Sequence, residues 1–347
     1  MGLKKVDRLE LPPTADMHVH LRQDKLMELV TPQISHGGTD TVLVMPNLQP
    51  PITTVAAALE YSSNLKSISP DVIAEAAAAG IANVKMYPQG VTTNSASGVT
   101  NLDDFYPVFE AMEKHDMMLN LHGEVADLTG HGDISHEEAF LPCLKELNER
   151  FPKLRLVLEH CTTAAALDAV LACGPTVAAT ITAHHLYSTF ADCCDPLAFC
   201  KPIPKKPTDR DALVRAVIRD EDDGKFFFGS DSAPHLLSTK HVGPEGKVPA
   251  GVYTQPYCTQ LVLLALEEAV DRGVISDDDI TQEKLERFLS KSGRRFYKLP
   301  EPAKGTKIIL ERKDEIIPKS IKSTDGSVEV GNSRAGAKVW SLRWEGV

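Results

Sequence analysis

The stretch "ADMHVHLRQ" (residues 15–23) places two histidines one residue apart in a strand-like run, with Arg22 next in the same alternation. In a β-strand, residues i, i+2 and i+4 share one face. A rise of ~3.3 Å per residue separates the Cα atoms of His18 and His20 by roughly 6–7 Å, so both imidazoles can reach one metal ion. An isolated pair of this kind is explained equally well as two half-buried polar residues at a strand end, so the surrounding sequence has to decide.

Short apolar runs alternate with helix-like segments along the rest of the chain. Candidate strands cover residues 15–21, 40–47, 83–88, 118–125, 154–160, 176–185, 197–203 (the weakest) and 225–232, and helix-like segments cover residues 55–68, 102–116, 162–173 and 259–273. This rhythm predicts eight parallel strands with helical crossovers, and strands that are apolar on both faces suit a closed barrel. An open doubly wound sheet has the same rhythm, but no G-x-G-x-x-G follows the first strand.

The predicted fold class is therefore α/β, a (β/α)8 TIM-type barrel, and a chain of 347 residues suits one such domain over residues 1–347. Beyond the helix-like "TQEKLERFLSKSGRRFYKLP", residues 303–347 contain short β-like pieces. We interpret these pieces as a C-terminal tail packed on the barrel and not as a second domain.

Composition and local pattern indicate which partners and which compartment to expect. The chain has 37 Lys and Arg against 48 Asp and Glu, a net charge of −11, and no dense basic cluster, which disfavours nucleic-acid binding. Its seven cysteines form no C-x-x-C pair, which favours a reducing compartment. No apolar run approaches the ~20 residues of a membrane helix, and the N-terminus lacks the apolar segment of a secretory signal. We expect a soluble, cytoplasmic protein that binds neither nucleic acid nor membrane.

Polar residues that could bind metal fall at or just past the ends of several predicted strands. The pair His18 and His20 ends the first, His122 the fourth, His160 the fifth and Asp231 the eighth. In barrel enzymes the active site gathers at the C-terminal ends of the strands. Imidazole and carboxylate are ligands of Zn²⁺, and catalytic zinc sites leave one position open. Although a lone histidine at a strand end is usually structural, this set predicts a metal site.

Lys85 in "NVKMYP" (residues 83–88) lies within an apolar predicted strand. Such a lysine is ordinarily ion-paired or reaches toward solvent. Burial and nearby cations would instead lower its pKa and leave a neutral amine. A neutral amine can take up carbon dioxide to form a carbamate, an anionic ligand that is able to bridge two metal ions.

Six motifs stand in order between Asp16 and Gly251: "DMHVHLR", "MPN", "VKMYPQGVTTNS", "LHGEV", "LEHCTT" and "GSDSAPH". This series resembles the successive signatures of the dihydroorotases of the shorter, monofunctional class in the amidohydrolase superfamily, and "SGRRFYKLP" beyond it also fits. The resemblance implies two Zn²⁺ ions bridged by N6-carboxylated Lys85 and a hydroxide. It assigns the first ion to His18, His20 and Asp231, and the second to His122 and His160.

The same resemblance implies a reaction, the reversible cyclisation of N-carbamoyl-L-aspartate to L-dihydroorotate in de novo pyrimidine (UMP) biosynthesis. Asp231 would accept the proton of the hydroxide and return it to the departing nitrogen. The residues implied to bind substrate are Arg22, Asn47 and His235 at its carboxylate, Ala250 through its backbone, and Thr92 and Thr93 in a lid over residues 89–101. Relatives of this class are commonly dimers, so a homodimer is expected.

Three other functions share parts of this sequence pattern. A deaminase of the same superfamily has H-x-x-E at the acid position, whereas His122 and Glu124 are only two residues apart. A dihydropyrimidinase or hydantoinase acts on neutral cyclic diamides, which offer no carboxylate to Arg22. A non-catalytic barrel that serves as an interaction module would not need the intact ligand set. In "TAHH", His184 and His185 have no ligand position in the family pattern, and a supporting role is predicted for them.

Overall fold

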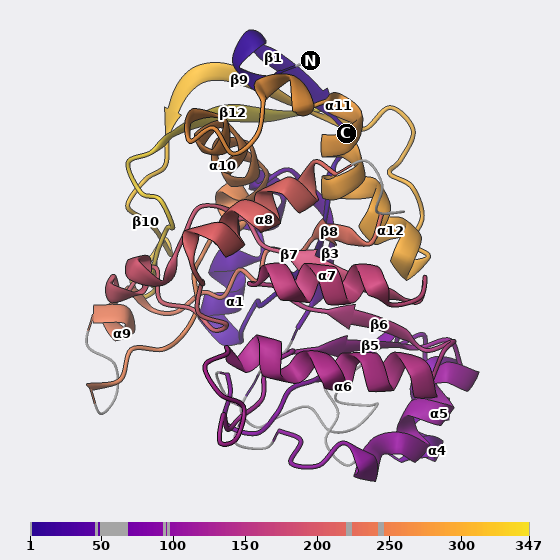
Figure 1. Cartoon of the computed structure of the whole chain (residues 1–347). Coiled ribbons are helices and arrows are strands. Elements are labelled where there is room, and N and C mark those ends of the chain that lie inside the picture. The colour runs from indigo at the N-terminus through magenta and orange to yellow at the C-terminus, as the bar shows by residue number, and fades with distance from the viewer. Residues whose placement is uncertain are drawn as a thin grey trace.

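Parallel strands form the centre of the fold (Figure 1). The computed structural model describes residues 2–45, 48, 69–92, 95, 98–219, 224–241 and 246–346. A five-stranded parallel sheet runs in the order β4 (Asn83–Met86), β5 (Met118–Leu121), β6 (Arg155–Leu158), β7 (Val177–Ile181) and β8 (Phe226–Phe228), and β2 (Thr14–Val19) pairs in parallel with β3 (Thr39–Val44). Within the described residues β3 pairs only with β2, and β4 only with β5.

The first and last barrel strands are joined at their C-terminal ends. Val19 forms a parallel bridge with Ser232. The buried carboxylate of Asp16 accepts hydrogen bonds from the backbone N of Ser230 at 2.7 Å, from the Ser230 hydroxyl at 2.6 Å and from the backbone N of His18 at 3.1 Å. This closure brings the His-x-His strand beside the segment that carries Asp231.

The predicted strand at 197–203 is wrong. These residues are irregular, and β7 pairs directly with β8 through Ala179 and Phe226. Pro202 and Pro204 explain the difference, since a proline has no N–H to donate to a strand ladder. The described part of the barrel therefore contains seven strands, and the helix predicted at 55–68 lies outside the described residues.

Alternation along the strands separates an inner from an outer face. Met118, Val157, Ala178 and Phe227 come from four neighbouring strands and pack together as an apolar layer inside the barrel. Because side chains alternate with a period of two, the residues two positions further on face the same interior. Glu159 is one of these, which explains how a carboxylate comes to be buried at the end of an apolar strand.

Helices surround the barrel, and Figure 1 shows α6, α7 and α8 stacked along one side of the strands. The α-helices of the described residues are α1 (Asp24–Val30), α2 (Gln33–His36), α4 (Pro70–Ala78), α5 (Tyr106–Lys114), α6 (His136–Arg150), α7 (Ala164–Ala172), α8 (Pro207–Val217), α9 (Leu237–His241), α10 (Cys258–Asp271), α11 (Gln282–Glu286) and α12 (Ser292–Tyr297). Side chains cap some of these helices at their starts: Ser135 and Glu138 form a capping box on α6, and the Thr163 hydroxyl caps α7.

The C-terminal tail is built into a sheet with the N-terminus. Strands β1 (Arg8–Leu11), β9 (Lys307–Ile316) and β12 (Lys338–Glu345) form an antiparallel sheet in that order, and β10 (Ser320–Lys322) pairs with β11 (Glu329–Gly331). Ile308 and Leu310 of β9 are fully buried and belong to the main core with Leu261 of α10. The two termini consequently lie near each other (Figure 1). The helices of the described ranges all fall short of the length and apolarity that crossing a bilayer requires.

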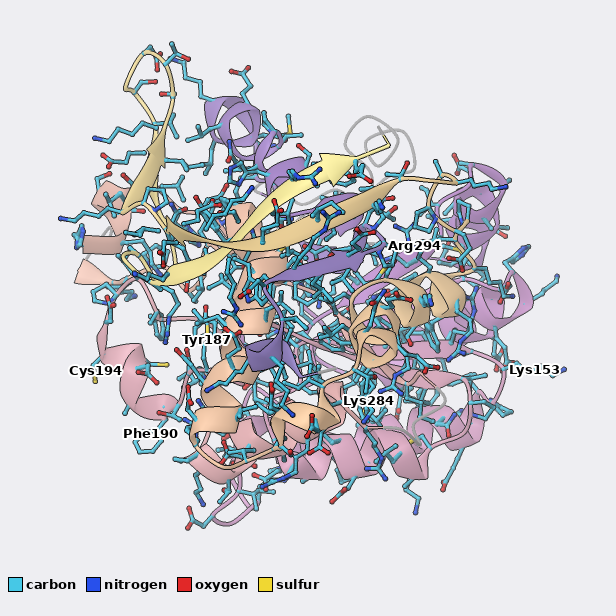
Figure 2. The ribbon with its side chains drawn as sticks, turned by 90° about the horizontal axis from the view of Figure 1, so that it is seen from above. Lys153, Tyr187, Phe190, Cys194, Lys284 and Arg294 are labelled. Carbon is cyan, nitrogen blue, oxygen red and sulfur yellow. The ribbon has the colours of Figure 1, made fainter. Side chains whose placement is uncertain are left out.

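A buried arginine ties α12 to the barrel. Arg294, labelled in Figure 2, donates to the Thr41 hydroxyl at 3.0 Å and to the Pro300 carbonyl at 3.1 Å, and it forms an ion pair with Asp40. Its planar guanidinium can satisfy several acceptors at once. The sequence motif "SGRRFYKLP" therefore has a structural role at this position.

Glu137 on α6 provides a test of how the helices are joined to the barrel. Its buried carboxylate accepts from the Thr162 backbone N at 2.8 Å and from the Thr163 hydroxyl at 2.5 Å. Burial raises the pKa of Glu137 to about 7, so the folded protein holds this proton more tightly than the unfolded chain. The stabilisation is present at pH values below the unfolded pKa and is lost as pH rises through about 7.

We expect the Glu137→Gln variant to lack this pH dependence. Each pKa unit corresponds to ~1.4 kcal/mol, so the wild type should lose on the order of 3 kcal/mol relative to the variant between pH 4.5 and pH 8. Urea denaturation at several pH values measures the difference. Parallel stability curves for the two proteins would contradict the assignment.

Candidate metal centre

Three of the predicted ligands converge at the joined ends of β2 and β8. The Nε2 atoms of His18 and His20 lie 3.3 Å and 3.1 Å from the same oxygen, Oδ1 of Asp231. All three side chains are buried. One nitrogen or oxygen from each lies within 4.8 Å of the others, which is the spacing of a shared cation.

The hydrogen bonds of the two histidines fix which nitrogen faces the centre. His18 Nδ1 lies 2.8 Å from Glu159, and His20 Nδ1 lies 2.5 Å from the carbonyl oxygen of Met45. A carbonyl only accepts, so His20 carries its proton on Nδ1. Burial lowers the pKa of His20 to about 4, so its Nε2 lone pair points at a carboxylate oxygen. A cation between them relieves this repulsion, as in metal-bound histidines.

A second pair of histidines adjoins the first. The ring centroids of His122 and His160 are 4.6 Å apart, and His160 lies 5.2 Å from His18. Burial lowers the pKa of both His122 and His160. His122 Nε2 lies 2.9 Å from Glu124 Oε2, which leaves Nδ1 to face a ligand. His160 Nδ1 is buried without a hydrogen-bond partner among the described residues.

Lys85 completes the set from β4. Its Nζ is buried and has no hydrogen-bond partner in the described ranges. Burial lowers the pKa of Lys85, although the charges of Glu159 and Asp231 oppose this shift. A buried ammonium without acceptors is costly, whereas a neutral amine in this position is a nucleophile.

Backbone strain is concentrated at the same place. His160 and Asp231 have φ angles of 41° and 45°, and Arg22 has a φ of 65°. Such values are uncommon for residues other than glycine and cost on the order of 1–3 kcal/mol each. Hydrogen bonds hold the first two: the His160 N donates to the Thr180 hydroxyl at 2.7 Å, and the Asp231 N donates to the His18 carbonyl at 2.8 Å.

The predicted substrate-binding residues are brought together only in part. His235 Nε2 lies 3.2 Å from a guanidinium nitrogen of Arg22 and 2.9 Å from the Ala250 carbonyl oxygen. Burial and the charge of Arg22 lower the pKa of His235 to about 3, so this imidazole is neutral. Thr92 lines a cavity of about 580 Å³ that Ala250 also lines. Asn47 and Thr93 lie outside the described residues.

Sequence reasoning missed Glu159. This buried carboxylate accepts from the Thr180 hydroxyl at 2.5 Å and from the Asn120 amide, in addition to its contact with His18. Glu159 therefore orients the predicted ligand His18 through Nδ1, the ring nitrogen that does not face Asp231. The available signal was an acidic residue that directly precedes His160 at the end of the apolar run "LRLVLEH".

The Glu159→Gln variant is expected to bind metal or turn over substrate 10–100-fold less well, because the charge that aligns His18 is removed. Zinc titration against a chelator measures the affinity. Glu137→Gln is the matched control, since it makes the same change in a buried glutamate that contacts none of the predicted ligands. Equal effects of the two substitutions would contradict a specific role for Glu159.

An α/β barrel with histidines, an aspartate and a lysine at its C-terminal rim defines an amidohydrolase. In agreement, the family model described as Amidohydrolase matches residues 64–299. A probable dihydroorotase of Schizosaccharomyces pombe is 44% identical over 330 residues, 90% of this chain and 94% of that protein. The dihydroorotase of Saccharomyces cerevisiae is 41% identical over 98% of this chain and 99% of that protein.

The solved structures agree with the sequences. The crystal structure of Saccharomyces cerevisiae dihydroorotase in complex with 5-fluoroorotic acid superposes with a TM-score of 0.85 at 40% identity, and covers 98% of this chain and 99% of that one. This confirms the predicted barrel class. The chain belongs to the dihydroorotases, a family of cyclic amide hydrolases. Its alignment to the budding-yeast sequence runs over 380 positions, more than its own 347 residues, so the relative has residues without a counterpart here.

Proposed function

We propose that this chain interconverts N-carbamoyl-L-aspartate and L-dihydroorotate, the dihydroorotase step of pyrimidine biosynthesis. The observation that carries the proposal is the buried cluster of His18, His20, His160, Asp231 and Lys85 at one rim of the barrel. Membership of the dihydroorotases supports the substrate.

The donor set fits two zinc ions. Lys85 Nζ and His160 Nδ1 are buried polar atoms without partners in the described part of the chain, and the lone pair of His20 faces a carboxylate. The residues that would hold the ions are His18, His20, Asp231, His122, His160 and Lys85 in its carboxylated form. When bound, such a pair polarises the attacked carbonyl and lowers the pKa of water toward neutrality.

Asp231 is proposed as the group that moves the proton. Its carboxylate lies at the centre of the cluster, and the neighbouring histidines hold its pKa well below the usual range against the opposing effect of burial. In hydrolysis it would take up the proton of the attacking water and deliver it to the ring nitrogen that departs. In cyclisation it would remove a proton from the ureido nitrogen, as microscopic reversibility requires.

Arg22 is proposed to bind the substrate carboxylate. Its Nε donates to the Pro234 carbonyl at 3.1 Å, which orients the guanidinium beside His235 and the Ala250 backbone. A planar guanidinium can bind a carboxylate through two parallel hydrogen bonds. Asn47, Thr92 and Thr93 stay predictions for the same substrate, the two threonines as part of a closing lid.

The assembly and location are also proposals. The resemblance predicts a homodimer. The cysteine pattern predicts a cytoplasmic location, and the length and element pattern predict a single barrel domain that includes the tail at 303–347. Size-exclusion chromatography with light scattering distinguishes a dimer from a monomer. The second candidate function is dihydropyrimidinase or hydantoinase activity. Its substrates are neutral cyclic diamides, whereas dihydroorotate carries a carboxylate.

The Arg22→Met variant tests the substrate. Loss of a buried charge pair costs on the order of 2–5 kcal/mol, so kcat/KM for dihydroorotate should fall by about 30- to 4,000-fold. The neutral analogue dihydrouracil should remain a poor substrate of both proteins. Arg343→Met, on the exposed edge of β12, is the control. Efficient turnover of dihydrouracil by the wild type, unchanged by Arg22→Met, would instead favour the second candidate.

A further inference from the structure

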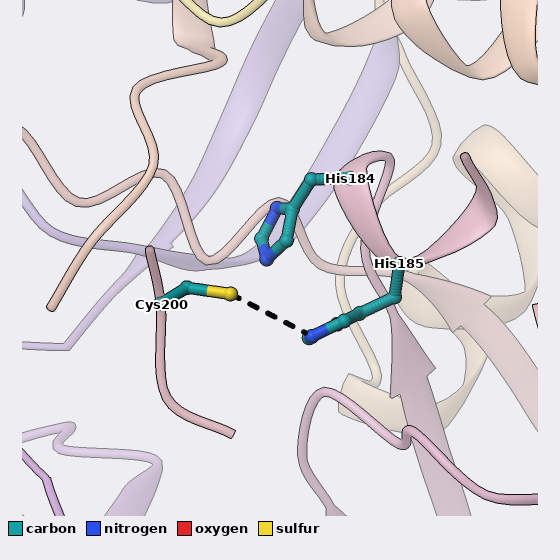
Figure 3. Close-up of side chains that lie close together, drawn as sticks. All are labelled: His184, His185 and Cys200. Carbon is teal, nitrogen blue, oxygen red and sulfur yellow. Dashed lines mark hydrogen bonds between the residues drawn. The ribbon is translucent and has the colours of Figure 1, made fainter. Parts of the chain in front are cut away.

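A second cluster of metal-binding side chains lies beside the centre described above and shares none of its residues. His184 and His185 are in a short 3₁₀ turn that follows β7, and Cys200 is in the irregular segment before α8. Figure 3 shows the three side chains pointing toward one another. One nitrogen from each histidine and the Cys200 sulfur all lie within 4.8 Å of one another, and all three residues are about 99% buried.

His184 is the residue whose environment is unexplained. Both of its ring nitrogens are buried without a hydrogen-bond partner among the described residues. A buried polar group left unsatisfied costs on the order of 1–3 kcal/mol. In Figure 3 its ring is directed at Cys200 and His185, so one of its two nitrogens faces the interior of the cluster.

The other two side chains are already oriented. His185 Nδ1 lies 2.9 Å from the Thr182 hydroxyl, and its Nε2 lies 3.9 Å from Cys200 Sγ. In tetrahedral zinc sites with Zn–S of ~2.3 Å and Zn–N of ~2.0–2.1 Å, a sulfur and a nitrogen ligand are about 3.5 Å apart. The observed separation exceeds this value by a few tenths of an ångström, which side-chain rotation can supply.

We propose that His184, His185 and Cys200 bind one Zn²⁺ ion, a third site separate from the proposed binuclear centre. The Pro202 carbonyl oxygen lies 3.2 Å from His185 Nε2 and 3.4 Å from Cys200 Sγ, so either this oxygen or a water would be the fourth ligand. The ion would fasten the irregular segment that carries Cys200 to the end of β7. The ion would therefore have a structural role at the C-terminal end of the barrel.

Zinc binding at this site would change the protonation of its ligands. Burial raises the pKa of the Cys200 thiol well above its usual range, so without a cation the thiol keeps its proton. Formation of the Zn–S bond breaks the S–H bond and releases one proton to solvent. Without an ion, His185 Nε2 carries the ring proton and donates it to the Pro202 carbonyl oxygen at 3.2 Å. Binding of Zn²⁺ through Nε2 would shift this proton to Nδ1, with no net release, and Nδ1 would donate to the Thr182 hydroxyl.

Cobalt substitution tests the third site. The full chain is stripped of metal and titrated with Co²⁺, and its near-ultraviolet absorption is recorded. A thiolate bound to Co²⁺ gives an intense charge-transfer band that nitrogen and oxygen ligands do not give. Because the proposed binuclear centre has no sulfur ligand, this band reports only on a cysteine site. We expect the band to accompany a third equivalent of metal.

Variants identify the sulfur. Cys200→Ser should abolish the band and reduce the metal bound from three ions per chain to two. Cys258→Ser, a second buried cysteine, and Cys194→Ser, an exposed one at the edge of the molecule in Figure 2, should retain both. If Cys200→Ser does not fold, zinc X-ray absorption of the wild type should still contain a sulfur scatterer at ~2.3 Å.

Three results would overturn the proposal: two bound metals with no sulfur signal, a band that survives in Cys200→Ser, or a band that disappears in Cys194→Ser. Turnover of dihydroorotate is measured on the same samples. A protein that is active without the sulfur signal refutes only the third site, whereas an inactive protein with the signal refutes only the proposed function.

Discussion

Replacing Lys85 with methionine is expected to abolish turnover, with a fall in kcat of more than 10³-fold, and to leave the proposed binuclear centre without a full complement of metal. When several groups act together in one reaction, removing one of them lowers kcat about as much as removing all of them. Methionine fills a similar volume, so the change removes the amine and leaves little cavity. Lys85 is the residue whose Nζ is buried without acceptors in the described ranges.

A half-buried lysine, Lys225, gives the matched control. Lys225 Nζ donates to the carbonyl oxygens of Val170, Cys173, Gly174 and Val177 at 2.7–3.1 Å, so its role is structural. Lys225→Met should lower the melting temperature but retain metal. The wild type supplied with ¹³C-bicarbonate should show a carbamate carbon resonance that Lys85→Met lacks. A Lys85→Met variant that keeps two metals and most of its activity would show that this lysine is only a packing residue.

Asp231→Asn is expected to have the second-largest effect, a fall in kcat of about 10²–10⁴-fold, the range typical of a lost general acid or base. Asparagine keeps the shape of the side chain but cannot accept the proton. Its amide would also place N–H groups or a weaker acceptor against His18 and His20, which lie 3.3 Å and 3.1 Å from the carboxylate.

Metal analysis and pH profiles separate the two roles of Asp231. Retention of metal with the loss of kcat would isolate the proton-transfer role. Loss of metal in parallel with kcat would assign the effect to binding. An Asn variant that keeps wild-type kcat over the whole pH range would contradict any role for this carboxylate in moving a proton.

Much of the site could be predicted because its residues follow from local pattern and barrel geometry. The period of two puts His18 and His20 on one face, and parallel strands bring the ends that carry His122, His160 and Asp231 to one rim. Once the rhythm of strands and helices is recognised, no long-range information is needed to group these residues.

Other features depend on contacts between distant residues. Glu159 is bonded to His18 across 141 positions, and Cys200 reaches His185 only because the intervening loop folds back. The pairing of β1 with β9 joins opposite ends of the chain. The wrong strand at 197–203 is a different case, since Pro202 within it already argued against a paired strand from the sequence alone.

The most direct test of the proposed function is the interconversion of dihydroorotate and carbamoyl aspartate by the purified chain at increasing zinc content. We predict activity in both directions that rises with the zinc bound to the histidine, aspartate and lysine cluster, and that is lost in Lys85→Met. A protein with this cluster fully loaded that converts neither compound, yet hydrolyses a neutral cyclic amide, would contradict the account. It would keep the amidohydrolase barrel but refute the roles given to Arg22 and His235.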